Sequence, residues 1–171
     1  RRQIAGSGKG LTLELGGKSP FIVFADADLD AAVEGVVDSI WFNQGQVCCA
    51  GSRVFVHEDI YDNFVKEAVK AFKKVKVGMP WEKDTQMGAQ IYEAHLKDIL
   101  KDIEAGKKEG AKVACGGKRL TTGAFAKGCF MEPTLIVDVT NDMKIAQDEI
   151  FGPVAVVIKV KTEEEVIKMA N

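Results

Sequence analysis

Two adjacent cysteines lie within a polar, glycine-containing stretch, Asn43-Gln44-Gly45-Gln46-Val47-Cys48-Cys49-Ala50-Gly51-Ser52-Arg53. A thiol held where backbone N–H groups converge ionises more readily and can attack a carbonyl carbon. The alternative is that Cys48 and Cys49 are small buried hydrophobic residues, which is the usual state of free cysteines. This stretch taken alone favours the inert alternative.

Two further polar groups stand beside glycine turns at the ends of expected strands. The segment Leu11–Leu15 alternates as a strand does and runs into Gly16-Gly17, and burial of Glu14 among its leucines would suit that carboxylate to act as a general base. The alternative is a strand-face Glu14 that points into water. The run Glu149–Phe151 precedes a Gly152-Pro153 bend that leads into an apolar strand. In open α/β sheets, ligands bind at the carboxyl ends of strands, where such turns lie.

The elements that must position these groups alternate between strand and helix patterns. They predict an α/β fold with an open, largely parallel sheet and flanking helices. The apolar run 21–24 is typical of a strand buried on both faces. The other expected strands are 11–15, 53–57, 112–115, 133–137 and 154–160. Helices with apolar residues at i, i+3 and i+4 are expected to begin near Leu29, Asp59, Ile91 and Thr162.

Composition narrows the class of protein. The chain has 171 residues, of which 46% are hydrophobic and 28% charged, as in one soluble globular domain. The net charge of −2, with both signs interspersed, indicates neither a nucleic-acid footprint nor a membrane-binding patch. No apolar run reaches the length of a bilayer span, and no signal-peptide pattern opens the chain. Because the chain opens without Met and stops inside a helical pattern, both ends are expected to be cut from a longer protein.

The cysteine count favours a reducing compartment. The four cysteines, at positions 48, 49, 115 and 129, are too few for a disulfide scaffold, and two of them are adjacent. Their spacing is not that of a zinc site, since no Cys-x-x-Cys occurs and the chain has two histidines, His57 and His95. We therefore expect no metal ion.

Three stretches, taken together, strongly resemble the aldehyde dehydrogenase superfamily. They are Leu13–Pro20, Phe42–Arg53 and Glu149–Val154, and their order and spacing fit the family over essentially the whole chain. Residues 4–17 and 34–38 look most like family-sixteen aldehyde dehydrogenases.

The resemblance implies oxidation of an aldehyde to a carboxylic acid. Cys48 matches the family's nucleophile, whose thiolate attacks the aldehyde to give a thiohemiacetal and then a thioester. Cys49 matches its variable neighbour. Glu14 matches the general base that activates Cys48 or the water that hydrolyses the thioester. The residue types suit this chemistry independently, since it needs a labile acyl adduct and a carboxylate base.

The resemblance also implies a cofactor, NAD or NADP, that is not covalently bound. Glu149 matches the residue that holds the nicotinamide ribose, and Phe151 matches the one that packs beside the nicotinamide. Leu15 and Gly16 match contacts at the reactive end of the cofactor. His95 falls where relatives often contact the ribose, but its place beside the apolar stripe of its helix favours a structural role.

The same resemblance sets expectations for the whole protein. Residues 1–171 would be a fragment of the catalytic domain, with 1–17 at the junction with a missing coenzyme-binding domain. The asparagine that completes the family's oxyanion site would lie before residue 1, so the fragment is expected to be inactive alone. The full-length protein would be a cytoplasmic homo-oligomer that acts on a small-molecule aldehyde.

Three alternatives stay open at this point. The first is a pseudoenzyme or scaffold domain that keeps the fold without turnover, against which the presence of both Cys48 and Glu14 counts. The second is a cysteine hydrolase that would use His57 or His95 as its base. The third is a phosphate-binding loop at residues 6–10, which match half of that motif and otherwise serve as a connector.

Overall fold

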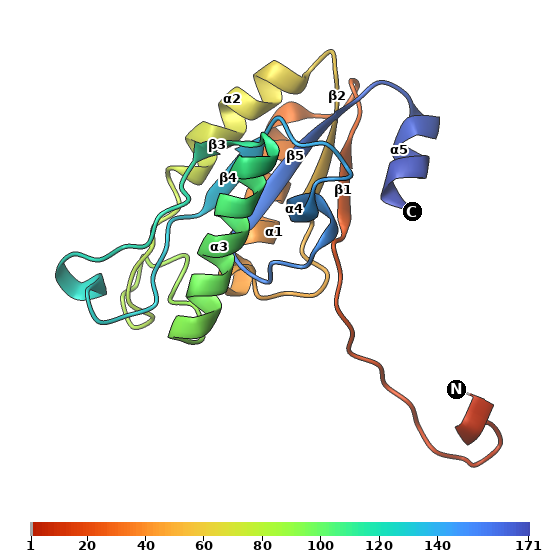
Figure 1. The fold of residues 1–171 in the computed structure, drawn as a ribbon, viewed down its shortest axis with the longest axis horizontal. Coiled ribbons are helices and arrows are strands. Elements are labelled where there is room, and N and C mark those ends of the chain that lie inside the picture. The colour runs from red at the N-terminus through yellow and green to blue at the C-terminus, as the bar shows by residue number, and fades with distance from the viewer. Residues whose placement is uncertain (1) are drawn as a thin grey trace.

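The computed structural model of the chain describes residues 2–171, and its centre is one five-stranded sheet with the order β1-β2-β5-β4-β3 (Figure 1). The strands are Pro20–Val23 (β1), Arg53–His57 (β2), Lys112–Cys115 (β3), Thr134–Val137 (β4) and Val154–Val160 (β5). β2 pairs in parallel with both β1 and β5, and β4 pairs in parallel with β5, whereas β3 runs antiparallel to β4. The predicted α/β class with a largely parallel sheet is confirmed.

Helices connect these strands. They are Leu29–Trp41 (α1), Tyr61–Phe72 (α2), Glu93–Glu109 (α3), Lys144–Gln147 (α4) and Glu163–Ala170 (α5). Short 3-10 turns occupy Arg2–Ile4 (η1), Phe42–Gly45 (η2) and Gly123–Phe125 (η3). The sequence pattern predicted all of the longer helices but not the single turn of α4.

Local side chains explain where two of these helices begin. The Asp28 carboxylate accepts a hydrogen bond of 3.1 Å from the Ala31 N–H at the start of α1. The Thr162 hydroxyl accepts one of 3.2 Å from the Glu165 N–H at the start of α5. Each bond satisfies an N–H group that the first turn of a helix leaves free.

The core consists of two apolar layers, one on each face of the sheet. α1 and α2 bury Ile40 and Phe64 against one face, where alternate β5 residues such as Val157 point. α3 buries Ile99 against the other face, where Ile158 of β5 points. Figure 1 shows α3 in front of the sheet and α1 behind it. A central strand buried on both faces explains the continuous apolar sequence of β5.

The prediction of a strand at 11–15 is wrong. Residues 8–19 form no helix or strand, and Leu11, Leu13 and Leu15 are exposed, Leu15 to 70%. In Figure 1 this segment leads away from the body of the domain towards the N-terminus. Alternating leucines can form a strand only beside another strand, and no described strand pairs with them.

The prediction that 21–24 is buried on both faces is also wrong. β1 is the outermost strand of the sheet, so Val23 is buried while Ile22 is 42% exposed. Its apolar sequence is that of a central strand, but its position is that of an edge strand.

Candidate active site

The loop that carries Cys48 begins with an unusual backbone run. After α1, Asn43, Gln44 and Gly45 all have positive φ angles, of 45°, 57° and 74°. Asparagine tolerates the left-handed region, but a glutamine there costs about 1–3 kcal/mol and persists only where the surroundings hold it. The run folds the chain back from the end of α1, so that Cys48 follows just before β2.

Side chains on both sides hold this loop in place. Within it, the Asn43 amide donates a 3.0 Å hydrogen bond to the Gln46 carbonyl. From outside, the side-chain amide of Gln90 donates to the Gln44 carbonyl at 3.2 Å, and the Ile91 N–H donates to Gln46 Oε1 at 3.0 Å. Gln90 is only 3% exposed, so its hydrogen bond is shielded from competing water. The segment before α3 therefore supports the cysteine loop.

The sequence-predicted site residues all line one open hollow of about 560 Å³. Cys48 is half-buried in its wall, while Glu14 and Glu149 are exposed. The hollow is lined by Glu14, Leu15, Gly16, Phe42, Asn43, Gln46, Val47, Cys48, Glu149 and Phe151. Residues that carry a thiol, two carboxylates and two aromatic rings, from three distant segments, thus line the same hollow.

The inert alternative for the cysteine pair does not match the structure. Cys48 is half-buried and Cys49 is exposed, whereas the buried free thiol is Cys115. Cys49 does not line the hollow with Cys48, but faces a second one beside Trp41 and Phe42. The two adjacent thiols therefore have different surroundings.

The expected burial of Glu14 among leucines is wrong. Glu14 lies in the irregular segment before β1 and its side chain is exposed. Glu14 lines the same hollow as Cys48 because the backbone of its segment packs against the cysteine loop at Gly17.

His95 supports Phe151. Its Nε2 lies 2.7 Å from the Phe151 carbonyl oxygen, to which it donates, and the two rings meet edge to face with centroids 6.3 Å apart. Phe151 has a φ of 54°, so this hydrogen bond holds a residue whose backbone is strained. Neither His95 nor His57 lines the hollow with Cys48, which counts against the cysteine–histidine hydrolase alternative.

Lys18 is a feature that the sequence reasoning missed. Its Nζ atom is buried without a hydrogen-bond partner among residues 2–171. Burial and then the neighbouring Arg53 lower the pKa of Lys18 to about 8, although Asp102, Asp148 and Glu149 act in the opposite direction. Only the tertiary structure reveals this, since a lysine after a glycine pair is usually exposed.

We expect Lys18→Met to stabilise the protein near neutral pH. Because the lysine pKa is lowered from 10.5 to about 8 on folding, the unfolded chain binds more protons between these pH values, and stability rises with pH across that window. Well below pH 8 the buried lysine is charged, and the penalty approaches its maximum of about 3 kcal/mol. Urea unfolding should therefore show Lys18→Met to be about 1–3 kcal/mol more stable at pH 7, with the gain vanishing towards pH 10.5.

The control is Lys66→Met, which removes an exposed lysine on α2. It should change stability by less than about 0.5 kcal/mol at every pH. If the added stability of Lys18→Met stays constant from pH 7 to pH 10.5, removal of a buried charge is not its cause.

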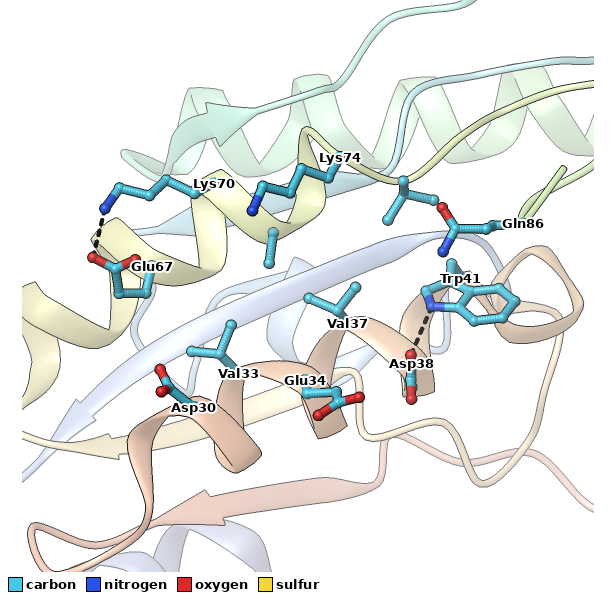
Figure 2. A pocket seen from close by; sticks show the side chains of 12 residues that line it. Asp30, Val33, Glu34, Val37, Asp38, Trp41, Glu67, Lys70, Lys74 and Gln86 are labelled. Carbon is cyan, nitrogen blue, oxygen red and sulfur yellow. Dashed lines mark hydrogen bonds and ion pairs between the residues drawn. The ribbon is translucent and has the colours of Figure 1, made fainter. Parts of the chain in front are cut away.

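The hollow in Figure 2 is separate from the one that Cys48 lines. It lies between α1 and α2, has a volume of about 480 Å³ and has Val33 and Val37 in its wall. Two pairs of its polar groups interact: Glu67 and Lys70 form a 2.7 Å ion pair, and Trp41 Nε1 donates a 2.9 Å hydrogen bond to Asp38. Within residues 2–171, no three His, Cys, Asp or Glu side chains are grouped as metal ligands, and no helix has the length and apolarity to cross a bilayer.

Comparison with known proteins identifies relatives of this chain. An aldehyde dehydrogenase of Enchytraeus buchholzi is 55% identical over 98% of this chain and 34% of its own length. Retinal dehydrogenase 2 of Rattus norvegicus is 53% identical over 95% of this chain and 31% of its own length. The chain thus spans about a third of the curated relatives it matches. These relatives do not test the family-sixteen resemblance, which stays a prediction.

Solved structures agree with the sequence relatives. A mutant aldehyde dehydrogenase from Bacillus cereus superposes with a TM-score of 0.89 at 49% identity, over 99% of this chain and 34% of that one. Betaine aldehyde dehydrogenase from Staphylococcus aureus, solved in complex with NAD+, superposes with a TM-score of 0.90 at 42% identity. The match covers 92% of this chain and 31% of that one. The sequence model described as "Aldehyde dehydrogenase family" matches residues 1–171. With this match over its whole length, the chain belongs to the aldehyde dehydrogenase family.

Proposed function

We propose that Cys48 is the nucleophile in an NAD(P)+-dependent oxidation of an aldehyde to a carboxylic acid. The observation that carries the proposal is that Cys48, Glu14 and Glu149, from three distant segments, all line one hollow. Family membership supports the reaction class. The structure of the Staphylococcus aureus betaine aldehyde dehydrogenase with NAD+ supports the choice of cofactor.

In the proposed mechanism Cys48 forms and releases the covalent intermediates. Its thiolate adds to the aldehyde carbon, and the carbonyl electron pair moves to oxygen, so that a thiohemiacetal forms. Loss of hydride from that carbon leaves a thioester on Cys48. Glu14 then takes a proton from water, the hydroxide adds to the thioester, and the acid leaves with return of the thiolate. When bound, NAD(P)+ supplies the acceptor for the hydride.

The groups opposite Cys48 suit the reactive end of such a dinucleotide. The exposed Glu149 carboxylate can accept hydrogen bonds from two ribose hydroxyls. Phe151, 40% exposed, offers an apolar ring face to a nicotinamide. Leu15 and Gly16 line the same hollow, and Gly16, which has no side chain, leaves room for the Glu149 carboxylate beside them. These four residues are the proposed cofactor contacts.

We further propose that residues 1–171 work as part of a larger assembly. The exposed Leu11, Leu13 and Leu15 support a junction at residues 1–17 with a coenzyme-binding domain, because alternating apolar side chains are expected to be covered in the working protein. The four free cysteines fit a reducing, cytoplasmic setting. The full-length protein is also proposed to form a homo-oligomer, and this rests on the family resemblance alone.

The direct test is turnover by the purified full-length protein. With a small aliphatic aldehyde and NAD+ or NADP+, we expect one reduced cofactor to form per molecule of carboxylic acid. Absence of both products with a panel of aliphatic and aromatic aldehydes, in a folded protein, would favour the scaffold alternative instead.

A polypeptide limited to these 171 residues is expected to show no turnover. It spans about a third of the relatives' length, and its site hollow is open to solvent along the exposed segment at Glu14. Reduced-cofactor formation measured side by side for this polypeptide and the full-length protein checks the expectation. Reduced-cofactor formation by the 171-residue polypeptide clearly above the enzyme-free background would contradict it.

A further inference from the structure

Gly17 packs directly on the backbone of Cys48. A Cβ atom at position 17 would fall well inside 3.0 Å of the Cys48 carbonyl oxygen, closer than real Cβ atoms approach. The obstacle is main chain, so it cannot turn aside as a flexible side chain would. The φ of Gly17 is not positive, unlike that of Gly45, so position 17 needs glycine for space and not for backbone conformation.

The Cys48 peptide is therefore confined from two sides. On one side is Gly17. On the other, the cysteine loop is fixed by Gln46, whose side chain accepts a hydrogen bond from the segment before α3, and by Gly45, which packs against the Gly152 backbone. The carbonyl, the N–H and the Cβ–Sγ bond of Cys48 all depend on the same Cα, so a displaced carbonyl also redirects the thiol.

The preceding residue, Gly16, touches a different part of the hollow. A Cβ atom there would lie 2.5 Å from Glu149 Oε2. The carboxylate is the end of a flexible, exposed side chain, so it can move away from an added methyl group. Two neighbouring glycines thus contact separate parts of the site, the thiol-bearing backbone and the carboxylate.

We propose that Gly17 is a positioning residue that sets the place of the Cys48 thiol, while Gly16 leaves room for the Glu149 carboxylate. The inference rests on the proposed function of Cys48. It assigns distinct kinetic effects to two adjacent residues of one motif.

The test is Gly17→Ala in the full-length protein. The added methyl group pushes the Cys48 peptide aside, and a nucleophile misplaced by about 1 Å loses about 10²-fold in rate. We expect kcat to fall about 30- to 100-fold and alkylation of Cys48 by iodoacetamide to slow about tenfold, with the KM for cofactor within about threefold. Gly16→Ala should show the opposite split, with a cofactor KM raised about tenfold and alkylation of Cys48 unchanged.

Gly35→Ala is the matched control. It adds the same methyl group on α1, outside the hollow that Cys48 lines; its nearest contact is the edge of the Phe21 ring at 3.1 Å, which can shift, and its φ is not positive. Its kcat, its rate of Cys48 alkylation and its KM for the cofactor should all stay within about twofold of those of the unsubstituted protein.

Two outcomes separate this inference from the proposed function. Unchanged kcat and alkylation rate in a folded Gly17→Ala overturn the positioning role and leave the role of Cys48 intact. Full activity in Cys48→Ala overturns the proposed function itself. If Gly17→Ala does not fold, a crystal structure of the unsubstituted full-length protein decides. Separation of the Gly17 Cα from the Cys48 carbonyl oxygen by more than about 4.5 Å would refute the contact, and packing within that distance would support it.

Discussion

Cys48→Ser in the full-length protein is expected to lower kcat/KM for aldehyde oxidation by about 10³-fold or more. Serine is nearly isosteric with cysteine, but its hydroxyl is not ionised near neutral pH, so the attacking thiolate is lost. Removal of a covalent nucleophile belongs to the largest single-residue effects in enzymes. Initial rates of reduced-cofactor formation at several aldehyde concentrations measure it.

The adjacent cysteine supplies the control for this prediction. Cys49 is exposed and faces a separate hollow, so Cys49→Ser should keep kcat/KM within about threefold. An equal loss in both variants would mean that the loop tolerates no change at either position. A loss of activity confined to Cys49→Ser would show that Cys49, and not Cys48, is the nucleophile.

Glu14→Gln is expected to lower kcat by about 10²- to 10⁴-fold, the usual contribution of a general base. The amide keeps the size of the side chain but cannot take a proton from water, so the thioester on Cys48 should persist. A rapid burst of reduced cofactor, close to one per site, should therefore remain before the slow steady state. Stopped-flow absorbance resolves the two phases.

Glu34→Gln is the matched control for Glu14. Glu34 is also exposed, but it lies on α1 in the wall of the hollow between α1 and α2, away from Cys48 (Figure 2). Its substitution should leave both phases unchanged. Loss of the burst together with the steady state in Glu14→Gln would place Glu14 in the activation of Cys48 rather than in hydrolysis.

Local sequence predicted those parts of the fold that depend on local pattern. The strands 53–57, 112–115 and 154–160 form as expected, and each has a neighbouring strand with which its backbone pairs. The leucines of 11–15 carry the same alternation but have no neighbouring strand. Whether a strand finds a partner, and whether it lies at an edge as β1 does, is decided by tertiary arrangement.

In the candidate site, too, the sequence predicted the local motifs but not the contacts between distant segments. Three motifs predicted the residues around the hollow, since reactive side chains beside glycine turns are visible in the sequence. The left-handed run at Asn43 and Gln44, and the support of that run by Gln90, were not predicted. Both depend on contacts between segments far apart in the chain, as does the burial of Lys18.

The most direct test of the account is to identify the residue that carries the acyl group during turnover. Glu14→Gln in the full-length protein, mixed with aldehyde and NAD(P)+ and quenched in acid during the steady state, should yield one acylated peptide by mass spectrometry. Fragment ions should place the acyl mass on Cys48. An acyl group on Cys49, Cys115 or Cys129, or an enzyme that turns over with no acylated residue, would contradict the assignment of Cys48 as the nucleophile.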